Sequence, residues 1–120
     1  QGKIYPAEDI VAGSFVFESG VLGTGNWCFT ASKEAEIDET IIYGSEGMIR
    51  FETFGKGEFE LWQNGKGPIL HQFELPKHIQ QPLIESIVRE LLGNGLSPSD
   101  GISGARANWV MQLIVNSRVF

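Results

Sequence analysis

The chain has 120 residues, 42% of them hydrophobic and 20% charged, and a formal net charge of −6. This length suits one domain with a single core. The acidic excess argues against a nucleic-acid surface, which needs clustered Lys and Arg. No apolar run reaches the roughly 18 residues of a membrane span, and the single cysteine, Cys28, excludes an internal disulfide. We expect Cys28 to be a small buried residue.

The N-terminal third predicts a strand hairpin. Tyr5 and Pro6 favour an extended lead-in. Residues 9–17 form a strand that is apolar on both faces, so we expect both of its faces to be covered. After a turn at 18–20, a second strand covers 21–30. Its side chains alternate between Gly23, Gly25 and Trp27 on one side and Leu22, Thr24, Asn26 and Cys28 on the other. Such alternate glycines indicate a bend or the close approach of another backbone.

A second hairpin, over residues 36–51, is the centre of the predicted sheet. Residues 36–43 and 48–51 are its arms, and Gly44-Ser45-Glu46-Gly47 is its turn, with glycines where a positive φ is expected. A hairpin of this size needs neighbouring strands or helices to be stable in water.

Two more strands follow. Residues 53–57 break the pattern, 58–63 alternate cleanly, and 64–68 form a turn. Residues 69–75 complete the series, with Ile69, His71, Phe73 and Leu75 on one face.

The apolar period then changes to that of helices. The segment 76–94 has one apolar stripe and a stop signal at 93–95. Residues 97–100 carry start signals for a second helix, which begins with Gly101 and Gly104 and so predicts a close packing partner there. The stripe consists of Leu83, Ile84, Ile87, Val88, Leu91 and Leu92.

This order of elements predicts an α+β fold. Residues 1–120 would form one domain with an open, mainly antiparallel sheet of about six strands and helices packed on one face, a two-layer sandwich.

The residues alone do not assemble an active site. The glycine-rich run 20–25 opens a strand and not a helix, so it lacks the context of a phosphate-binding loop. Glu36 and Asp38 face away from Glu39 on an extended chain, and we expect Asp38 to be exposed. His71 and His78 lie in settings too different for a metal pair, so no metal site is predicted.

The run of elements resembles the C-terminal domain of the glucose–fructose oxidoreductase, inositol dehydrogenase and rhizopine-catabolism (Gfo/Idh/MocA) family. The resemblance rests on residues 5–9, 17–21 and 95–99 and above all on Ile42-Tyr43-Gly44-Ser45-Glu46-Gly47-Met48-Ile49-Arg50-Phe51. It covers nearly the whole chain. It implies a parent enzyme that is a cytoplasmic NAD- or NADP-dependent dehydrogenase of sugars, inositols or related polyols.

In that family an N-terminal Rossmann domain holds the nicotinamide and the catalytic residues. No position of this chain matches them, so no catalytic or cofactor-binding residue is expected here, and the fragment alone should be inactive. The partner would be the missing Rossmann domain, with a small polyol as substrate. The resemblance places Trp27, Lys33, Glu34 and Glu36 beside the substrate cleft.

We also expect a homo-oligomer formed through the open sheet face. Ile37, Ile41, Ile49, Phe51, Phe59 and Leu61 are assigned to the face that the helices cover. The opposite face would carry Thr40, Ile42, Met48, Arg50, Glu58, Glu60 and Trp62, of which Thr40, Ile42, Arg50, Glu60 and Trp62 are the interface candidates. The alternative function is a stand-alone, non-catalytic binding or dimerisation domain.

Overall fold

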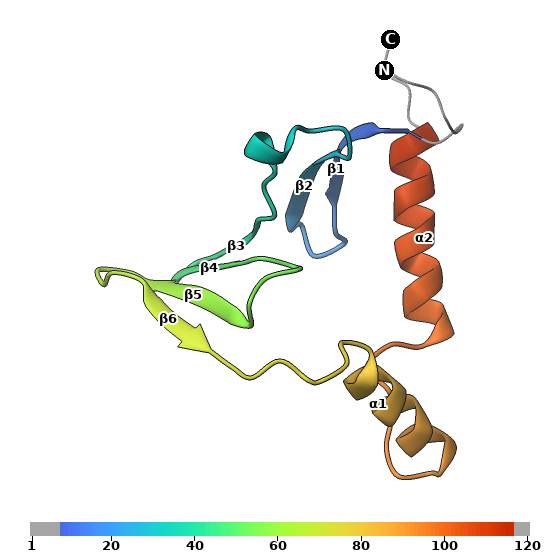
Figure 1. The fold of residues 1–120 in the computed structure, drawn as a ribbon. Helices are drawn as coiled ribbons and strands as arrows, with labels where there is room; N and C mark the ends of the chain where they lie inside the picture. Colours follow the sequence, from blue (N-terminus) through green and yellow to red (C-terminus); the bar gives the residue numbers. More distant parts are fainter. Residues whose placement is uncertain (1–7, 117–120) are drawn as a thin grey trace. The chain divides into compact units, whose positions relative to one another are not determined.

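The computed structural model describes residues 8–116, so the predicted lead-in at Tyr5 and Pro6 lies outside the described residues. Six strands and two α-helices follow one another within it (Figure 1), which confirms the α+β class. None of the described helices is long and apolar enough to cross a membrane. The elements are β1 (Ile10–Val16), β2 (Leu22–Cys28), the short 3-10 helix η1 (Lys33–Ala35), β3 (Thr40–Gly44), β4 (Gly47–Phe51), β5 (Glu58–Gln63), β6 (Ile69–Gln72), α1 (Gln81–Leu91) and α2 (Gly101–Asn116).

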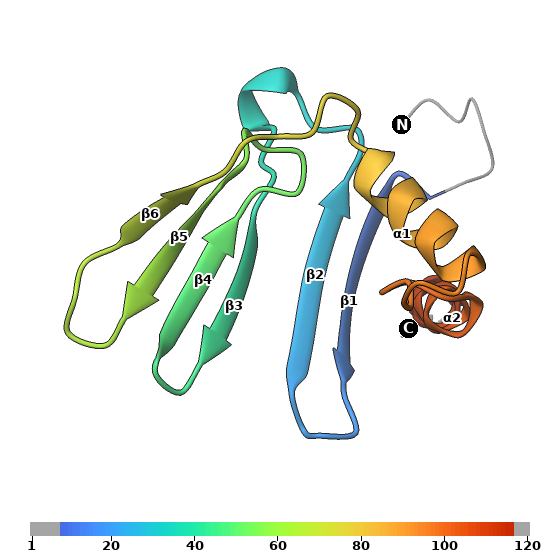
Figure 2. The same ribbon diagram turned by 90° about the horizontal axis from the view of Figure 1, so that it is seen from below.

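The strands are hydrogen-bonded as two antiparallel sheets and not as one continuous sheet. β1 and β2 form the first, and β3, β4, β5 and β6 follow one another in the second (Figure 2). The described chain divides into two compact units accordingly. The first unit contains β1, β2, η1 and α2, and the second, Glu36–Ser97, contains β3 to β6 and α1.

In the first unit the predicted turn between β1 and β2 is confirmed. The Phe17 N–H donates to the Val21 carbonyl at 2.8 Å, and the Gly20 N–H donates back to the Phe17 carbonyl at 2.8 Å. Gly20 has φ +84°, a left-handed conformation in which a side chain is strained. The turn therefore sets the register in which Val16 faces Leu22.

The glycines of this hairpin make room for side chains and not for a second backbone. The Phe15 ring covers its cross-strand partner Gly23, and the Trp27 ring covers Gly25. At Gly13 a Cβ would lie 2.8 Å from Ile114 Cγ2, so α2 packs on β1 through a position that tolerates only hydrogen. The predicted close approach of another backbone is therefore wrong for Gly23 and Gly25, where aromatic side chains make the contact.

The opposite face of β1 is uncovered in the described chain. Ile10 is 54% exposed and Val16 68%, so the prediction that both faces of this strand are covered is wrong. The reason is that α2 packs on one face of this two-stranded sheet, and no other described helix or strand packs on the second face. Cys28, at the end of β2, is exposed, which corrects the expected burial; its Sγ lies 3.8 Å from Thr30 Oγ1.

The predicted start of α2 is confirmed by a reciprocal cap. The Ser103 N–H donates to Asp100 Oδ1 at 2.7 Å, and the Asp100 N–H donates to Ser103 Oγ at 3.0 Å. These bonds satisfy donors that a helix N-terminus otherwise leaves unpaired. The close packing expected at Gly101 and Gly104 is absent from the described structure, because a Cβ at either position would meet open space.

In the second unit the hairpin of β3 and β4 turns through Ser45 and Glu46, with Gly44 paired to Gly47. The positive φ expected at the turn glycines is confirmed at Gly47, whose φ is +159°, and is wrong at Gly44. Gly47 is required for space, because a Cβ there would overlap the carbonyl oxygen of Trp62. The first arm is also shorter than predicted, since residues 36–39 precede the strand.

The register of this hairpin corrects the predicted faces. Thr40 pairs with Phe51 and Ile42 with Ile49, so both lie on the apolar face; Ile41 pairs with Arg50 and lies on the other. Partners directly opposite in an antiparallel pair share a face. The apolar face carries Thr40, Ile42, Ile49, Phe51, Phe59, Leu61, Ile69 and His71, and the polar face carries Ile41, Tyr43, Met48, Arg50, Glu58, Glu60, Trp62, Leu70 and Gln72.

β5 has the predicted bounds, and β6 is shorter than predicted, although the Phe73 N–H extends it with a 2.9 Å bond to the Gly57 carbonyl. The predicted turn at 64–68 is confirmed by Gly65, with φ +77°. His71 stacks on Phe59, its cross-strand partner, with ring centroids 4.7 Å apart and planes 9° from parallel. His71 is thus a packing residue of the apolar face.

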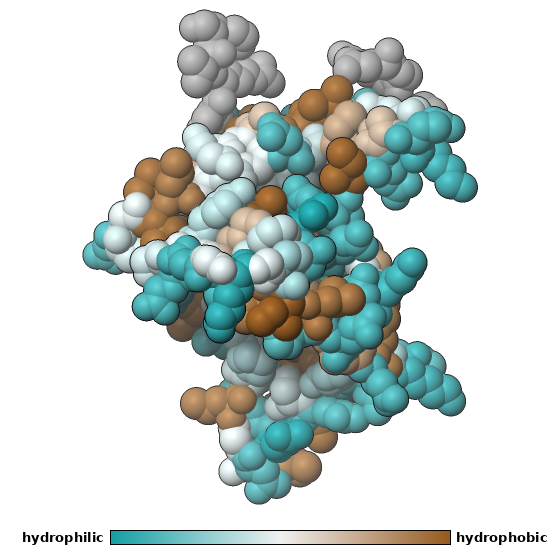
Figure 3. Space-filling view, turned by 90° about the vertical axis from the view of Figure 1, so that its left-hand side faces the viewer, coloured by the Kyte–Doolittle hydropathy of each residue, from teal (hydrophilic) through white to brown (hydrophobic). Residues whose placement is uncertain are grey.

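α1 ends as predicted, in a Schellman motif. The Gly93 N–H donates to the Glu90 carbonyl and the Asn94 N–H to the Arg89 carbonyl, both at 2.9 Å, while Gly93 has φ +74°. The apolar stripe of α1 is uncovered in the described chain, from Leu83 and Ile87 at 39% exposure to Leu91 at 81%. Apolar side chains reach the surface elsewhere too (Figure 3), and no hydrophobic side chain among the described residues is fully buried.

Candidate functional site

A shallow hollow of about 130 Å³ lies on the polar face of the four-stranded sheet. Asp38 and Glu39, just before β3, line one edge, β4 and β5 form its floor, and the 52–57 loop closes one side. Acidic residues and two cations make up most of its lining: Asp38, Glu39, Arg50, Phe51, Glu52, Gly55, Lys56, Glu58, Phe59, Glu60 and Leu70.

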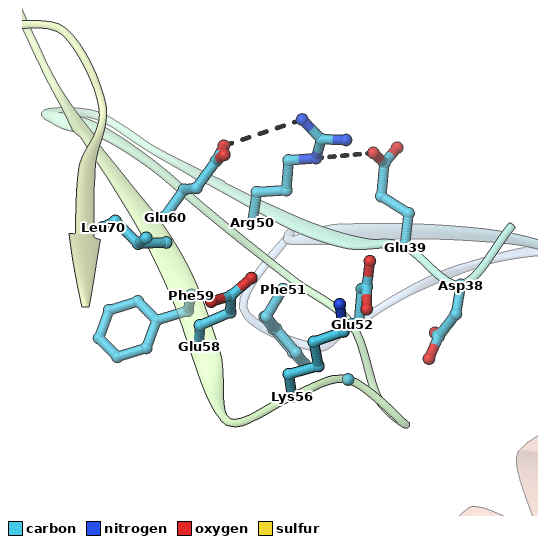
Figure 4. A pocket seen from close by; sticks show the side chains of 11 residues that line it. Asp38, Glu39, Arg50, Phe51, Glu52, Lys56, Glu58, Phe59, Glu60 and Leu70 are labelled. Carbon is cyan, nitrogen blue, oxygen red and sulfur yellow. Dashed lines mark ion pairs between the residues drawn. The ribbon is translucent and has the colours of Figure 1, made fainter. Parts of the chain in front are cut away.

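Arg50 organises the hollow. Its Nε lies 2.7 Å from Glu39 Oε1, and its Nη1 lies 3.8 Å from Glu60 Oε2 (Figure 4). The strand register explains both contacts: Arg50 is directly opposite Glu60 on β5 and diagonal to Glu39, which precedes Ile41 by two residues. The side chains are 49%, 36% and 35% exposed, so each pair is worth about 0–1 kcal/mol.

Two further hydrogen bonds orient the carboxylates. Trp62 Nε1 donates to Glu60 Oε2 at 3.1 Å, and Gln72 Nε2 donates to Glu58 Oε2 at 3.0 Å. Each carboxylate keeps acceptor sites open, because a carboxylate has about four lone-pair directions. The hollow can therefore accept hydrogen bonds from hydroxyl or amine donors.

The other face of the same sheet carries an apolar hollow of about 340 Å³. The two hollows share Phe51 and Phe59, together with Glu52, Gly55 and Glu58. Phe73 and Leu75 line the second one and are 56% and 50% exposed. Its other lining residues are Ile49, Glu52, Thr53, Gly55, Gly57 and Glu58.

The predicted cleft residues lie outside both hollows. Lys33 and Glu34 are exposed on η1, and Trp27 lies over Gly25 on β2, 44% exposed. Hydrogen bonds from its own backbone N–H and from the Ser32 hydroxyl lower the pKa of the Glu34 carboxyl below its ordinary value. Glu36 is exposed between η1 and β3. Their role in substrate binding stays a prediction.

The predicted interface residues separate into two groups. Arg50, Glu60 and Trp62 lie together on the polar face. Thr40 and Ile42 lie on the apolar face, so they cannot share a flat contact with the other three. Self-association through the polar face stays a prediction for the three that remain.

The chain is similar to an oxidoreductase. The relative is Oxidoreductase P35 of Formosa agariphila, which is 32% identical over 103 residues. The matched region is 86% of this chain and 31% of that protein, so the chain spans about a third of the relative's length. No protein-family model matches the chain, and no solved structure matches it either.

Two contacts of this region were not expected from the sequence. Asp38 is half-buried, and its Oδ2 accepts a 2.6 Å hydrogen bond from the Phe54 N–H, so it holds the 52–57 loop and is not merely a surface acid. Glu39 is paired with Arg50. The positions of Glu39 just before β3, Arg50 on β4 and Glu60 on β5 could have indicated this triad once the hairpin register was known. Among residues 8–116, no three His, Cys, Asp or Glu side chains are arranged to hold a metal ion.

Proposed function

We propose that this chain forms the substrate-side and oligomerisation part of an oxidoreductase of the Gfo/Idh/MocA type, dependent on NAD or NADP. The observation that carries the proposal is the similarity to Oxidoreductase P35, which extends over 86% of this chain but 31% of that protein. A protein of that size has room for a nucleotide-binding domain beside the equivalent of this chain.

The exposed apolar surface supports a larger assembly. In the second unit the α1 stripe leaves Leu83 and Ile87 39% exposed. In the first unit the outer face of β1 leaves Ile10 54% and Val16 68% exposed. Burying one such side chain fully is worth about 1.5–3 kcal/mol. Monomeric soluble proteins rarely expose large apolar patches, so each of these two faces suits contact with further protein.

The proposal assigns nicotinamide binding to a separate domain. The glycine-rich run at residues 20–25 leads into β2 and not into a helix, as predicted. It therefore lacks the helix N-terminus on which dinucleotide sites place the pyrophosphate. The single cysteine suits the proposed cytoplasmic location, where disulfides are rare.

The substrate class proposed is a sugar, inositol or related polyol. Glu34 and Glu36, with Lys33, supply acceptors and a donor that hydroxyl groups can use, whereas apolar walls cannot select a polyol. In the same proposal the polar sheet face, with Arg50 and Trp62, forms the subunit contact.

The test is hydride transfer by the full-length gene product. We expect reduction of NAD⁺ or NADP⁺, followed by absorbance, with at least one member of a panel of aldoses, inositols and sugar alcohols. A protein that is folded by circular dichroism but reduces neither nucleotide with any of them contradicts the proposal. If such a protein still self-associates, the non-catalytic dimerisation domain is the better interpretation.

A further inference from the structure

Two Asn-Gly pairs lie in the second unit, Asn64-Gly65 and Asn94-Gly95. Both asparagines are exposed, and both are followed by a glycine with a positive φ, +77° at Gly65 and +137° at Gly95. Glycine has no side chain to shield its backbone nitrogen, so this nitrogen can reach the asparagine side-chain amide carbon. On sequence alone the two sites are equally reactive.

The structure separates them. Asn64 lies in the turn between β5 and β6: its Nδ2 donates to the Ser45 carbonyl at 3.2 Å, and its N–H donates to the Glu46 carbonyl at 3.0 Å. Rotation of this amide toward Gly65 must first break the bond to Ser45. The side chain of Asn94 makes no hydrogen bond to any residue in the described range 8–116. Its backbone N–H alone is held, by the Arg89 carbonyl.

We propose that Asn94 is a site of spontaneous deamidation, and that the fold protects Asn64 from the same reaction. The Gly95 nitrogen loses its proton to water or hydroxide and attacks Asn94 Cγ. A new C–N bond closes a five-membered succinimide, and the side-chain nitrogen leaves as ammonia. One water molecule then opens the ring at either carbonyl, which yields aspartate or isoaspartate. No oxidant, reductant or enzyme is needed.

The product changes the end of α1. Asn94 is the residue whose N–H closes the Schellman motif, next to carbonyl groups that carry the negative end of the helix dipole. A carboxylate there is repelled by that dipole, and isoaspartate lengthens the backbone by one methylene. The reaction also adds a negative charge to a chain whose formal charge is −6. Aged protein should therefore contain a more acidic form with a weakened α1 terminus.

The experiment is peptide mapping by mass spectrometry of the full chain during incubation at pH 8 and 37 °C, with Asn64 as the internal control. We expect Asn94 to deamidate about five-fold faster than Asn64, because breaking one ordinary hydrogen bond before the reaction slows Asn64 by about that factor. In guanidinium chloride the two rates should converge, because the bond to Ser45 is lost. The acidic species on ion exchange should disappear in Asn94→Gln, whose longer side chain cyclises slowly.

Two results overturn the proposal. The first is a ratio of the Asn94 to the Asn64 deamidation rate below about two in the folded protein, because even a weak hydrogen bond should slow Asn64 by more than that. A ratio that persists in denaturant would show that the neighbouring sequence, and not the fold, separates the sites.

Discussion

Gly57 is a position at which we expect a single added methyl group to destabilise the fold. Gly57 is buried, its φ is +79°, and an added Cβ would lie 2.6 Å from the Phe73 carbonyl oxygen and 3.1 Å from Leu75 Cγ. The first atom is backbone and cannot rotate away. The end of β6 must therefore move, which strains the 2.9 Å bond from the Phe73 N–H to the Gly57 carbonyl.

Gly65 supplies a matched control. Its φ is +77°, but a Cβ there would meet no heavy atom within 4 Å. Both alanine variants carry the same left-handed backbone cost of about 1–2 kcal/mol. Gly57→Ala adds a steric cost of about 1–3 kcal/mol. We expect Gly57→Ala to lower the free energy of unfolding by about 2 kcal/mol more than Gly65→Ala does.

Urea unfolding followed by circular dichroism measures this difference, from the two midpoints at a common slope. Hydrogen exchange of the Phe73 amide gives a local readout, because its protection should fall in Gly57→Ala and not in Gly65→Ala. Equal losses of stability in the two variants would refute the steric argument and leave only the shared φ cost.

Four further outcomes are expected. Hydrogen bonds from the Ser103 N–H and, to a smaller extent, from the Ser103 hydroxyl lower the pKa of the Asp100 carboxyl in the folded chain. The ionised carboxylate therefore stabilises α2 at pH values above the unfolded-state pKa, and this stabilisation is lost as the pH falls through the folded-state pKa. Asp100→Ala should therefore lower the melting temperature at pH 7, with the difference disappearing in acid; a pH-independent difference contradicts this. Trp62→Glu should convert a dimer to a monomer in light scattering, because it places an unpaired charge in the contact; a wild-type monomer at tens of micromolar excludes that interface. In the full enzyme Glu36→Ala should lower kcat/KM for the polyol and leave nucleotide affinity unchanged. An unaltered kcat/KM would show that Glu36 takes no part in substrate binding. Calorimetric titration of this chain alone should detect no NAD or NADP binding; micromolar affinity would contradict the assignment of the nucleotide to another domain.

The local elements could be predicted from the sequence because their signals are local. A period of two at residues 58–63, and a Gly-Asn-Gly stop after a stripe of period 3.6, each specify an element within a few residues. The cap at Asp100 is likewise encoded by residues within one helical turn. These features depend on backbone dihedral angles and near-neighbour hydrogen bonds, so no distant contact is needed to predict them.

The tertiary structure alone decided which residues meet. The turn at Ser45 and Glu46 pairs Thr40 with Phe51, and a shift of one residue in that register would exchange the two faces of the strand. The same register brings Arg50 to Glu60 and Glu39, a triad spread over residues 39–60. Steric contacts explain two of the glycines: a side chain at Gly47 would overlap the Trp62 carbonyl oxygen, and one at Gly13 would clash with Ile114. These partners are far apart in the sequence. The residue pattern within one segment cannot predict how close an atom of another segment will lie.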